Sequence, residues 1–557
     1  MKNSNSFFYS KLIVIFFLIS VSSCKKKDNN SLTKENICSS EKIAGLSFTD
    51  SERDSLLSEI EYTVGEYDKI RKIEIKNSTA PRFYFDPRPY GFNISAEQKL
   101  IQWDLPSSVE LPKDKAEIAF LPVYKLASLI KERKISSVEL TQLYIERIRQ
   151  FGDTLECIIT LTEDLAMAQA KRADEELAQG KYRSYLHGIP YGLKDLFSVP
   201  EYKTTWGSVP YKNQVLEETS AVYKKLEEAG AVLVAKLSLG ELAMDNVWFD
   251  GETKNPWDLT QGSSGSSAGS AAATSAGLLA FAIGTETWGS IISPSTRCGV
   301  TGLRPTFGRV SRYGAMALSW TMDKVGPICR SAYDCALVFD VIRGSDSQDK
   351  TTVDYPFNYS TNTDILKLRV GYLRNLFEGE NYPGKSNDLQ ALEVIKSMGI
   401  GLEAVKLPDN LPVEPCAIIL EAEAGAAFDE LTRSNEDDKM RLQHKYAWPN
   451  IFRKARFIPA VEYIQASRIR DLLIEELNKL MKEYDVIVCP SFGGNQLLMT
   501  NLTGHPCVVV PNGFDNDNHP TSISFIGNLY DEATLLVFAK AYQETTEWDE
   551  QVPPLFN

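Results

Sequence analysis

The sequence predicts an α/β protein with a central sheet covered by helices on both of its faces. Between Ala221 and Leu237 a helix-forming segment (AVYKKLEEAG) ends in a glycine and is followed by an apolar, strand-like run (AVLVAKL). This order is the repeating unit of α/β folds. Helix-like and strand-like segments alternate from about Leu121 onward. Because the strand-like runs are apolar along their whole length, we expect both faces of the sheet to be buried.

Local signals place individual elements along the chain. Ser136 and Glu139 form a capping box that begins a helix, and Gly152 is its expected end. The segment GIPYGLKDLF (residues 188–197) is expected to form a turn, a short strand and a second turn. The remaining predictions are helices over Phe48 to about Arg71, Thr162 to Leu177 and Ala460 to Tyr484, and strands over Lys367 to Leu373 and Asp485 to Ser491.

The N-terminus has the features of an export signal. Lys2 and Lys11 accompany a run of ten apolar residues from Leu12 to Val21, which is too short to span a membrane as a helix. The ending VSSC resembles the lipobox of bacterial lipoproteins, which implies lipidation of Cys24 as the first residue of the mature chain. An ordinary cleaved signal with an incidental cysteine is the alternative. We expect an exported protein, lipid-anchored to the bacterial cell envelope on its periplasmic face or at the surface.

These signals divide the chain into four parts. The residues that follow Cys24 are polar and charged, as suits a tether. Farther on, FYFDPRPYGF (residues 83–92) is an irregular stretch rich in proline and aromatic residues. The predicted parts are a signal peptide (1–23), a polar tether (24–45), a partly helical N-terminal extension (46–115) and a large α/β domain (116–557).

Charge and cysteine spacing exclude several classes of partner. The formal net charge is -14 and no Lys/Arg cluster suited to phosphates is present, so nucleic acid is not expected and a small-molecule ligand is. The nine cysteines are scattered without a C-x-x-C pair, and the four histidines have no metal-like spacing. We therefore expect neither a metal site nor a disulfide framework. Cys329 and Cys335 are the nearest pair in the sequence, but sequence alone does not choose disulfide partners.

The stretch GSSGSSAGSAAATSAG (Gly262 to Gly277) contains six serines among glycine and alanine. Such a tract on its own is typical of a flexible linker. Here an apolar segment and a second glycine-flanked serine, Ser290, follow closely. Glycines beside serines allow the backbone to approach a ligand, and successive N–H groups in such turns bind anions. The context therefore favours a loop of the kind that an oxyanion hole requires.

Several motifs resemble those of the amidase signature family. The family's serine loop, GT-D/E-T-x-GSI motif and GLKPT motif are matched in order by GSSAGSAAATSAGLLAFAIGTETWGSIISPSTRCGVTGLRPT (Gly265 to Thr306). Its lysine strand is matched by GIPYGLKDLF, and the similarity continues to NLTGHPCVVVPNGF (Asn501 to Phe514). The resemblance implies the amidase signature fold, with a central mixed β-sheet covered by helices on both faces. It also implies an amide hydrolase that needs no cofactor and no metal.

The resemblance assigns catalytic roles position by position. Lys194 matches the family's base, Ser266 its proton relay after a cis peptide bond, and Ser290 its nucleophile. A serine hydroxyl is a weak nucleophile without a base, and a lysine is a base only when burial lowers its pKa and keeps it neutral. The oxyanion would be held by the backbone N–H groups of Thr287, Trp288, Gly289 and Ser290.

Two further residues are candidates for the substrate site, and three depart from the family pattern. Ser267 is placed to contact substrate or to support the relay by hydrogen bonding, and His505 either lines the acyl pocket or packs beside it. Trp288 stands where many members have glycine and others aspartate, Ile292 where many have arginine, and Arg297 where phenylalanine or another residue is common. These departures leave the substrate class undetermined, whereas all the residues of the proton relay are present.

We therefore expect a lipid-anchored serine amidohydrolase that cleaves a carboxamide C–N bond through an acyl-enzyme on Ser290. The nearest alternative is the A-type subunit of the tRNA-dependent amidotransferase, which shares the motifs and resembles the run GLRPTFGRVSRYGAMA (Gly302 to Ala317). The export signal argues against it, because charged tRNA is cytoplasmic. The other alternative is a non-catalytic lipoprotein scaffold, against which the presence of Lys194, Ser266 and Ser290 argues. Oligomeric state and acyl specificity stay open.

Overall fold

The computed structural model describes residues 32–379 and 381–557. The chain contains two compact units, which are described separately: the first ends at Ile75 and the second begins at Lys76. The predicted signal peptide and Cys24 lie outside the described residues. Within the described ranges, every helix is too short or too polar to cross a membrane.

The first unit consists of helices α1 (Lys34–Ala44) and α2 (Asp50–Arg71). Each begins at a threonine capping box, Thr33 with Asn36 and Thr49 with Glu52, which satisfies the first N–H groups of the helix. Arg53 of α2 donates to Glu41 of α1 at 2.7 Å and holds the pair together. Helix α2 matches the helix predicted from Phe48. Helix α1 lies in the stretch predicted as a polar tether, where the capping residues favour a helix despite the polar composition.

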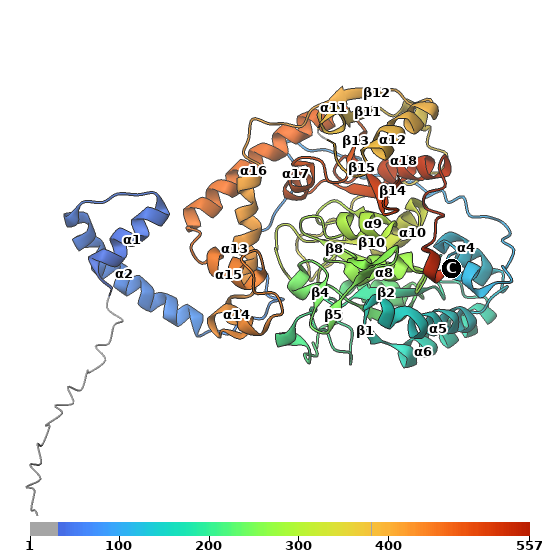
Figure 1. Ribbon diagram of the computed structural model, residues 1–557, viewed down its shortest axis with the longest axis horizontal. Helices are drawn as coiled ribbons and strands as arrows, with labels where there is room; N and C mark the ends of the chain where they lie inside the picture. Colours follow the sequence, from blue (N-terminus) through green and yellow to red (C-terminus); the bar gives the residue numbers. More distant parts are fainter. Residues whose placement is uncertain (1–31, 380) are drawn as a thin grey trace, which may run out of the picture. The chain divides into compact units, whose positions relative to one another are not determined.

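The second unit is built on a mixed sheet that has eleven strands in the described part of the chain (Figure 1). Strand β2 is parallel to β3 and β8, and β11 is parallel to β12 and β13, whereas the other pairs are antiparallel. This arrangement confirms the predicted mixed α/β fold. In spatial order the strands are β1 (Ile158–Leu161), β3 (Val232–Leu237), β2 (Pro190–Lys194), β8 (Phe281–Glu286), β10 (Lys324–Cys329), β9 (Thr301–Arg304), β14 (Cys507–Phe514), β15 (Pro520–Gly527), β13 (Val486–Pro490), β11 (Val370–Leu373) and β12 (Leu402–Val405).

Helices and two small ribbons complete this unit. The ribbons pair β4 (Val247–Trp248) with β5 (Gly251–Glu252), and β6 (Lys254–Asn255) with β7 (Asp258–Gly262). The helices are α3 (Lys115–Ala119), α4 (Val123–Lys131), α5 (Ser137–Leu155), α6 (Glu163–Ala178), α7 (Ala221–Glu228), α8 (Ala268–Ser275), α9 (Ile292–Cys298), α10 (Ala332–Ile342), α11 (Arg374–Glu378), α12 (Lys385–Ser397), α13 (Ile418–Ala427), α14 (Asp429–Arg433), α15 (Trp448–Ala455), α16 (Ala460–Met481), α17 (Gln496–Thr503) and α18 (Glu532–Glu544).

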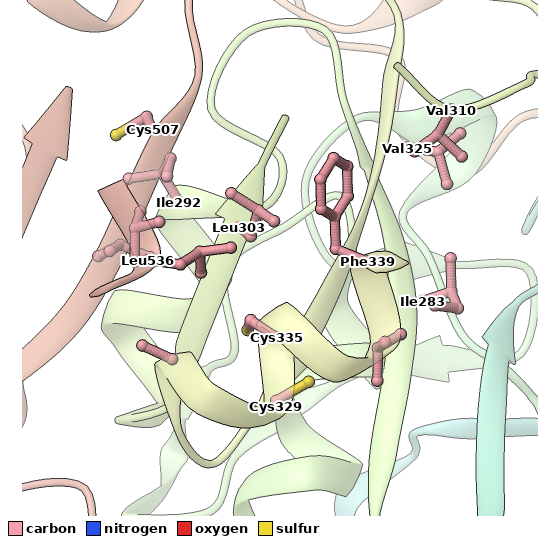
Figure 2. Packing of buried hydrophobic residues seen from close by; sticks show 14 of the residues in the cluster. Ile283, Ile292, Leu303, Val310, Val325, Cys329, Cys335, Phe339, Cys507 and Leu536 are labelled. Atoms are coloured by element: carbon pink, nitrogen blue, oxygen red, sulfur yellow. The ribbon is translucent and has the colours of Figure 1, made fainter. Parts of the chain in front are cut away.

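Both faces of the sheet are buried, as the continuous apolar strands predict. In β8, Phe281 and Ile283 belong to the larger hydrophobic cluster, whereas Ala282 between them belongs to a second cluster with the alanines of α8. Figure 2 shows the larger cluster from close by, where Phe339 and Cys335 of α10 lie beside strand residues such as Leu303. The eight described cysteines carry free thiols.

Candidate active site

Lys194 is the last residue of strand β2, which lies between β3 and β8 and carries the lysine into the interior. Its side chain is fully buried. The side-chain nitrogen Nζ lies within hydrogen-bond distance of three hydroxyl groups: Ser266 Oγ at 2.8 Å, Thr285 Oγ1 at 2.9 Å and Ser267 Oγ at 3.1 Å. None of these partners is a carboxylate, so no negative charge in direct contact offsets the cost of burying a positive charge.

The surroundings of Lys194 favour its neutral form. Burial lowers the pKa of Lys194 well below the ordinary lysine value, and the more distant carboxyl groups of Asp323 and Glu286 only partly oppose this shift. A neutral amine has a free lone pair and accepts a proton from a neighbouring hydroxyl. Burial therefore shifts Lys194 toward the neutral form that a base requires.

Ser266 and Ser267 lie in the loop between strand β7 and helix α8. The peptide bond between Gly265 and Ser266 is cis, as the family resemblance implies. A side chain at Gly265 would lie 1.8 Å from the carbonyl oxygen of Asp245, so only glycine fits there. Ser267 is buried, and its hydroxyl bonds Lys194 and both backbone groups of Thr285. This position gives Ser267 a supporting role in the hydrogen-bond network.

Ser290 lies in the loop between strand β8 and helix α9, and it is half-buried. The N–H of Ser267 donates to the carbonyl oxygen of Ser290 at 3.2 Å, which brings the two serine loops together. Among the described residues, Ser290 Oγ has no hydrogen-bond partner, and the N–H groups of residues 287–290 have no backbone or side-chain acceptor. Four donors without acceptors beside a half-buried hydroxyl form an arrangement suited to a negatively charged oxygen.

The buried carboxylate of Glu286 fixes the start of this loop. Its Oε2 accepts from the N–H groups of Ile291 at 2.9 Å and Ile292 at 3.0 Å, while Oε1 accepts from Arg304 and Asn501, both at 2.8 Å. Burial alone would raise the pKa of Glu286, but Arg304 and the hydrogen bonds hold it below the ordinary value. An ionised Glu286 thus binds the two N–H groups that follow Ser290 and leaves the preceding ones free.

Three residues of this network are absent from the sequence predictions. Thr285 bonds Lys194, Glu286 holds the loop, and Asp323 accepts from Thr287 Oγ1 at 2.5 Å and from the N–H of Leu318 at 2.8 Å. Thr285 and Glu286 lie inside the GTETWGS motif, so their polar side chains beside Ser290 are a signal that could have been used. Asp323 lies far from the motif in the sequence, and no local pattern indicates its contact with Thr287.

A cavity of about 410 Å³ adjoins the network. Thr285 and Thr287 line it from the catalytic side, and Leu196, two residues after Lys194, lines it as well. Met316, Leu318 and Trp320 contribute an apolar wall. This cavity, which we call the catalytic cavity, therefore reaches Thr285, which bonds Lys194, and Thr287 of the loop 287–290, which we call the oxyanion loop, although Lys194 and Ser290 do not themselves line it. It has room for an acyl group.

Other predicted residues lie away from this cavity. His505 is buried and does not line it; its ring bonds Thr503 at 2.8 Å, and burial together with Arg304 lowers its pKa to about 3. The Trp288 side chain is 47% exposed, and its ring does not line the cavity. Its backbone N–H therefore stays available as a donor. Ile292 is buried, and Arg297 is half-buried in α9.

One exposed turn brings together side chains of metal-binding type. Asp515, Asp517 and His519 lie between β14 and β15. The Asp515 carboxylate accepts from the N–H groups of Asp517 at 3.0 Å and His519 at 2.9 Å. The cluster therefore has a structural explanation in the turn itself.

Comparison with known proteins identifies the family of this chain. The family model described as Amidase matches residues 139–498, which is more than half of the chain and contains Lys194, Ser266 and Ser290. The chain belongs to the amidase signature family. Enzymes of this kind act on amide C–N bonds, and the chain is therefore an enzyme of that class.

Relatives of this chain include amidotransferase subunits and a peptide amidase. The A-type subunit of the glutamyl-tRNA(Gln) amidotransferase of Coxiella burnetii is 34% identical over 485 residues, which cover 78% of this chain and 99% of the relative. The solved structure of the native peptide amidase of Stenotrophomonas maltophilia is 28% identical, with a TM-score of 0.69, and covers 78% of this chain and 98% of that one. The solved structure of the A-type glutamyl-tRNA(Gln) amidotransferase subunit from Thermotoga maritima is 27% identical, with a TM-score of 0.65, over 78% of this chain and 96% of that one.

The conformation of the oxyanion loop, residues 287–290, depends on a glycine. Gly289 has φ +94°, and a Cβ there would lie 3.0 Å from Leu497 Cδ2. We expect Gly289→Ala to cost about 1–3 kcal/mol of stability and, by moving the N–H donors, to lower kcat about 10²-fold. Urea unfolding and steady-state amide hydrolysis would measure the two effects. Gly399→Ala is the control: its φ of +84° is equally unfavourable, but it lies at the end of α12, so its kcat should stay unchanged.

Proposed function

We propose that the chain is a serine amidohydrolase that cleaves a carboxamide C–N bond, with Ser290 as nucleophile, Ser266 as proton relay and Lys194 as base. The observation that carries the proposal is the buried Lys194, whose amine lies 2.8 Å from Ser266 Oγ and contacts hydroxyl groups alone. Burial lowers the pKa of such a lysine, which is the direction that a base requires.

The proposed reaction passes through an acyl-enzyme on Ser290. Neutral Lys194 takes a proton from Ser266, which takes the hydroxyl proton of Ser290 while Ser290 Oγ forms a bond to the carboxamide carbon. The free N–H groups of residues 287–290 bind the oxyanion. The proton then returns from Lys194 through Ser266 to the nitrogen, the C–N bond breaks and ammonia or an amine leaves. Water attacks the acyl-enzyme, and a carboxylic acid and free Ser290 are formed.

Covalent labelling tests the nucleophile. We expect a fluorophosphonate to add a single adduct to the wild-type protein, as measured by intact mass, and none to Ser290→Ala. Ser293→Ala is the matched control, because Ser293 lies in the next turn and bonds Ser264 at 2.7 Å; it should still be labelled. An adduct that persists in Ser290→Ala would show that another residue is the nucleophile.

The pH dependence of kcat/KM tests the base. Only neutral Lys194 accepts a proton, so activity should be lost as the pH falls through its lowered pKa and should be level above it. The plateau should extend well below the pH at which an ordinary lysine loses its proton. Initial rates of amide hydrolysis between about pH 5 and 10 would show this profile. A rate that rises only near the ordinary lysine pKa would contradict the assignment.

A second candidate is an A-type subunit of a tRNA-dependent amidotransferase. The curated relatives support it better than they support a free-standing hydrolase, because the A-type subunit of Coxiella burnetii matches this chain over 99% of its own length. Both candidates share the acyl-enzyme step. In the hydrolase the nitrogen leaves as free ammonia or an amine, whereas in the amidotransferase it is transferred to the glutamyl group of the tRNA.

An isotope experiment separates the two candidates. A carboxamide labelled with ¹⁵N would be incubated with the chain alone, and with glutamyl-tRNA(Gln), ATP and the partner subunits of an amidotransferase, because a carboxylate must be activated before it takes up ammonia. Release of free labelled ammonia at the full rate without tRNA would support the hydrolase. Release that requires the tRNA, with the label found on its glutamyl group, would support the amidotransferase candidate.

We further propose that the mature protein is exported and anchored to the envelope through a lipid on Cys24. The support is the N-terminal sequence: an apolar run of ten residues followed by VSSC. Incorporation of labelled palmitate into the wild type but not into Cys24→Ala is expected. Equal incorporation in both would contradict the anchor, and a protein that stays in the cytoplasm would favour the amidotransferase candidate.

A further inference from the structure

One wall of the catalytic cavity comes from a segment outside the region matched by the family model. Residues 78–84, which we call the strap, line the cavity together with Thr285 and Thr287. The family model begins at residue 139. The strap therefore adds to the catalytic cavity a wall that the matched part of the chain does not supply.

The strap is fastened at both of its ends. On one side Asn77 bonds Ala317 twice: its Nδ2 donates to the carbonyl oxygen at 2.9 Å, and its Oδ1 accepts from the N–H at 2.8 Å. On the other side Phe85 packs edge-on against Phe307, with ring centroids 5.0 Å apart, and Arg470 lies 3.3 Å from the centroid of its ring. Ala317 itself lines the cavity, so the first fastening point lies directly at its rim.

Between these points the strap makes few contacts, one of which is the edge-on packing of Phe83 against Tyr463, with ring centroids 6.3 Å apart. Among the described residues, its hydrogen bonds are those from Thr79 to Lys76 and from Arg82 to the hydroxyl of Tyr84, both local. Phe83 and Tyr84 are 55% and 45% exposed although both line the cavity. Large aromatic side chains held in an accessible position beside a cavity are typical of ligand contacts.

The rest of the cavity lining is mixed in character. Met316, Leu318 and Val325 are apolar, and Arg312 and Asp349 form an ion pair at 3.2 Å, while Asp323, Lys324 and Lys350 also line the cavity. A ligand in the cavity thus contacts aromatic and aliphatic groups, and the hydrogen-bonding groups for the scissile amide lie at the Thr285 and Thr287 end.

We propose that the strap determines acyl specificity, with Phe83 and Tyr84 contacting the acyl group, and that the preferred substrates are carboxamides with an aromatic or extended apolar acyl group. This inference rests on the proposed function. We expect longer acyl groups to bury the two aromatic rings and to gain affinity from that burial, and small acyl groups to gain little from it.

Two fluorophosphonate probes test the strap, one with a methyl group and one with a 4-phenylbutyl group on phosphorus. The double variant Phe83→Ala/Tyr84→Ala removes the aromatic contacts without entering the core, since both side chains are about half exposed. Tyr90→Ala is the matched control, because Tyr90 lies beyond Phe85, is 82% exposed and does not line the cavity. The second-order rate constants for labelling of Ser290 would be measured for all three proteins.

We expect the double variant to lose about tenfold of the labelling rate with the phenylbutyl probe, which corresponds to about 1.4 kcal/mol. Its rate with the methyl probe should stay unchanged, and Tyr90→Ala should match the wild type with both probes. If the ratio of the phenylbutyl to the methyl labelling rate constant is the same in the double variant as in the wild type, the strap proposal alone is overturned. This holds whether both rate constants stay unchanged or both fall equally. If neither probe labels the wild-type protein, the proposed nucleophile fails and the strap proposal is overturned with it.

Discussion

Replacement of Lys194 by methionine is expected to lower kcat/KM for amide hydrolysis by at least about 10³-fold. Methionine has a similar length and fills the same buried space, but it cannot accept a proton from Ser266, which lies 2.8 Å from the lysine nitrogen in the wild type. Ser290 would then lack a route for its proton. Steady-state kinetics with a primary carboxamide would measure the loss, and activity within tenfold of the wild type would show that Lys194 is not the base.

The same variant should be at least as stable as the wild type at neutral pH. The pKa of Lys194 is lowered in the folded state, so the unfolded chain binds more protons between that lowered value and the ordinary lysine value. Wild-type stability therefore rises with pH across this window and is lower below it. Lys194→Met should lack this dependence, which urea unfolding at several pH values would show.

Lys236 provides a contrasting buried lysine. It lies in the adjacent strand β3, and its amine is 2.7 Å from the buried carboxylate of Asp195. Lys236→Met leaves that carboxylate without its partner and should destabilise the protein by about 3–5 kcal/mol. If Lys194→Met were destabilised as strongly, Lys194 would have a structural role in the fold that the bonds to three hydroxyl groups do not explain.

The parts of the fold and site that could be predicted are those with local signals. The Ser136 and Glu139 capping box begins α5 as expected, although the helix continues past Gly152 to Leu155 because glycine is tolerated within a packed helix. The helix and strand predicted between Ala221 and Leu237 are α7 and β3. In the site, the motifs identify Lys194, Ser266 and Ser290, and the structure brings their loops together through Lys194 and Ser267.

The rest depends on contacts between segments far apart in the sequence. Asn501 bonds Glu286 across 215 residues, and Asn77 bonds Ala317 across 240. Neither contact leaves a periodic or compositional pattern, because each depends on how the strands are ordered in the finished sheet. For the same reason the Pro/aromatic stretch near residue 83 looks like irregular structure in the sequence, while the structure shows it lining the catalytic cavity.

Replacement of Glu286 by glutamine is expected to lower both stability and turnover. The amide keeps the shape of the carboxylate but leaves the buried Arg304, 2.8 Å away, without a negative partner. Removal of one partner of a buried ion pair costs about 3–5 kcal/mol. Because Glu286 also binds the N–H groups of Ile291 and Ile292, the oxyanion loop should lose its fixed geometry, and kcat should fall about 10²- to 10³-fold. Chemical unfolding and steady-state kinetics would measure these effects separately.

Glu532→Gln distinguishes an effect of lowered stability from an effect of altered oxyanion-loop geometry. Glu532 is equally buried, pairs with Arg309 at 3.1 Å and also accepts a backbone N–H, that of Thr306, but neither Glu532 nor Arg309 lines the catalytic cavity. Its substitution should lower the free energy of unfolding about as much as Glu286→Gln while leaving kcat within about twofold of the wild type. Equal losses of kcat in both variants would mean that turnover follows global stability, and that Glu286 does not act through the N–H groups beside Ser290.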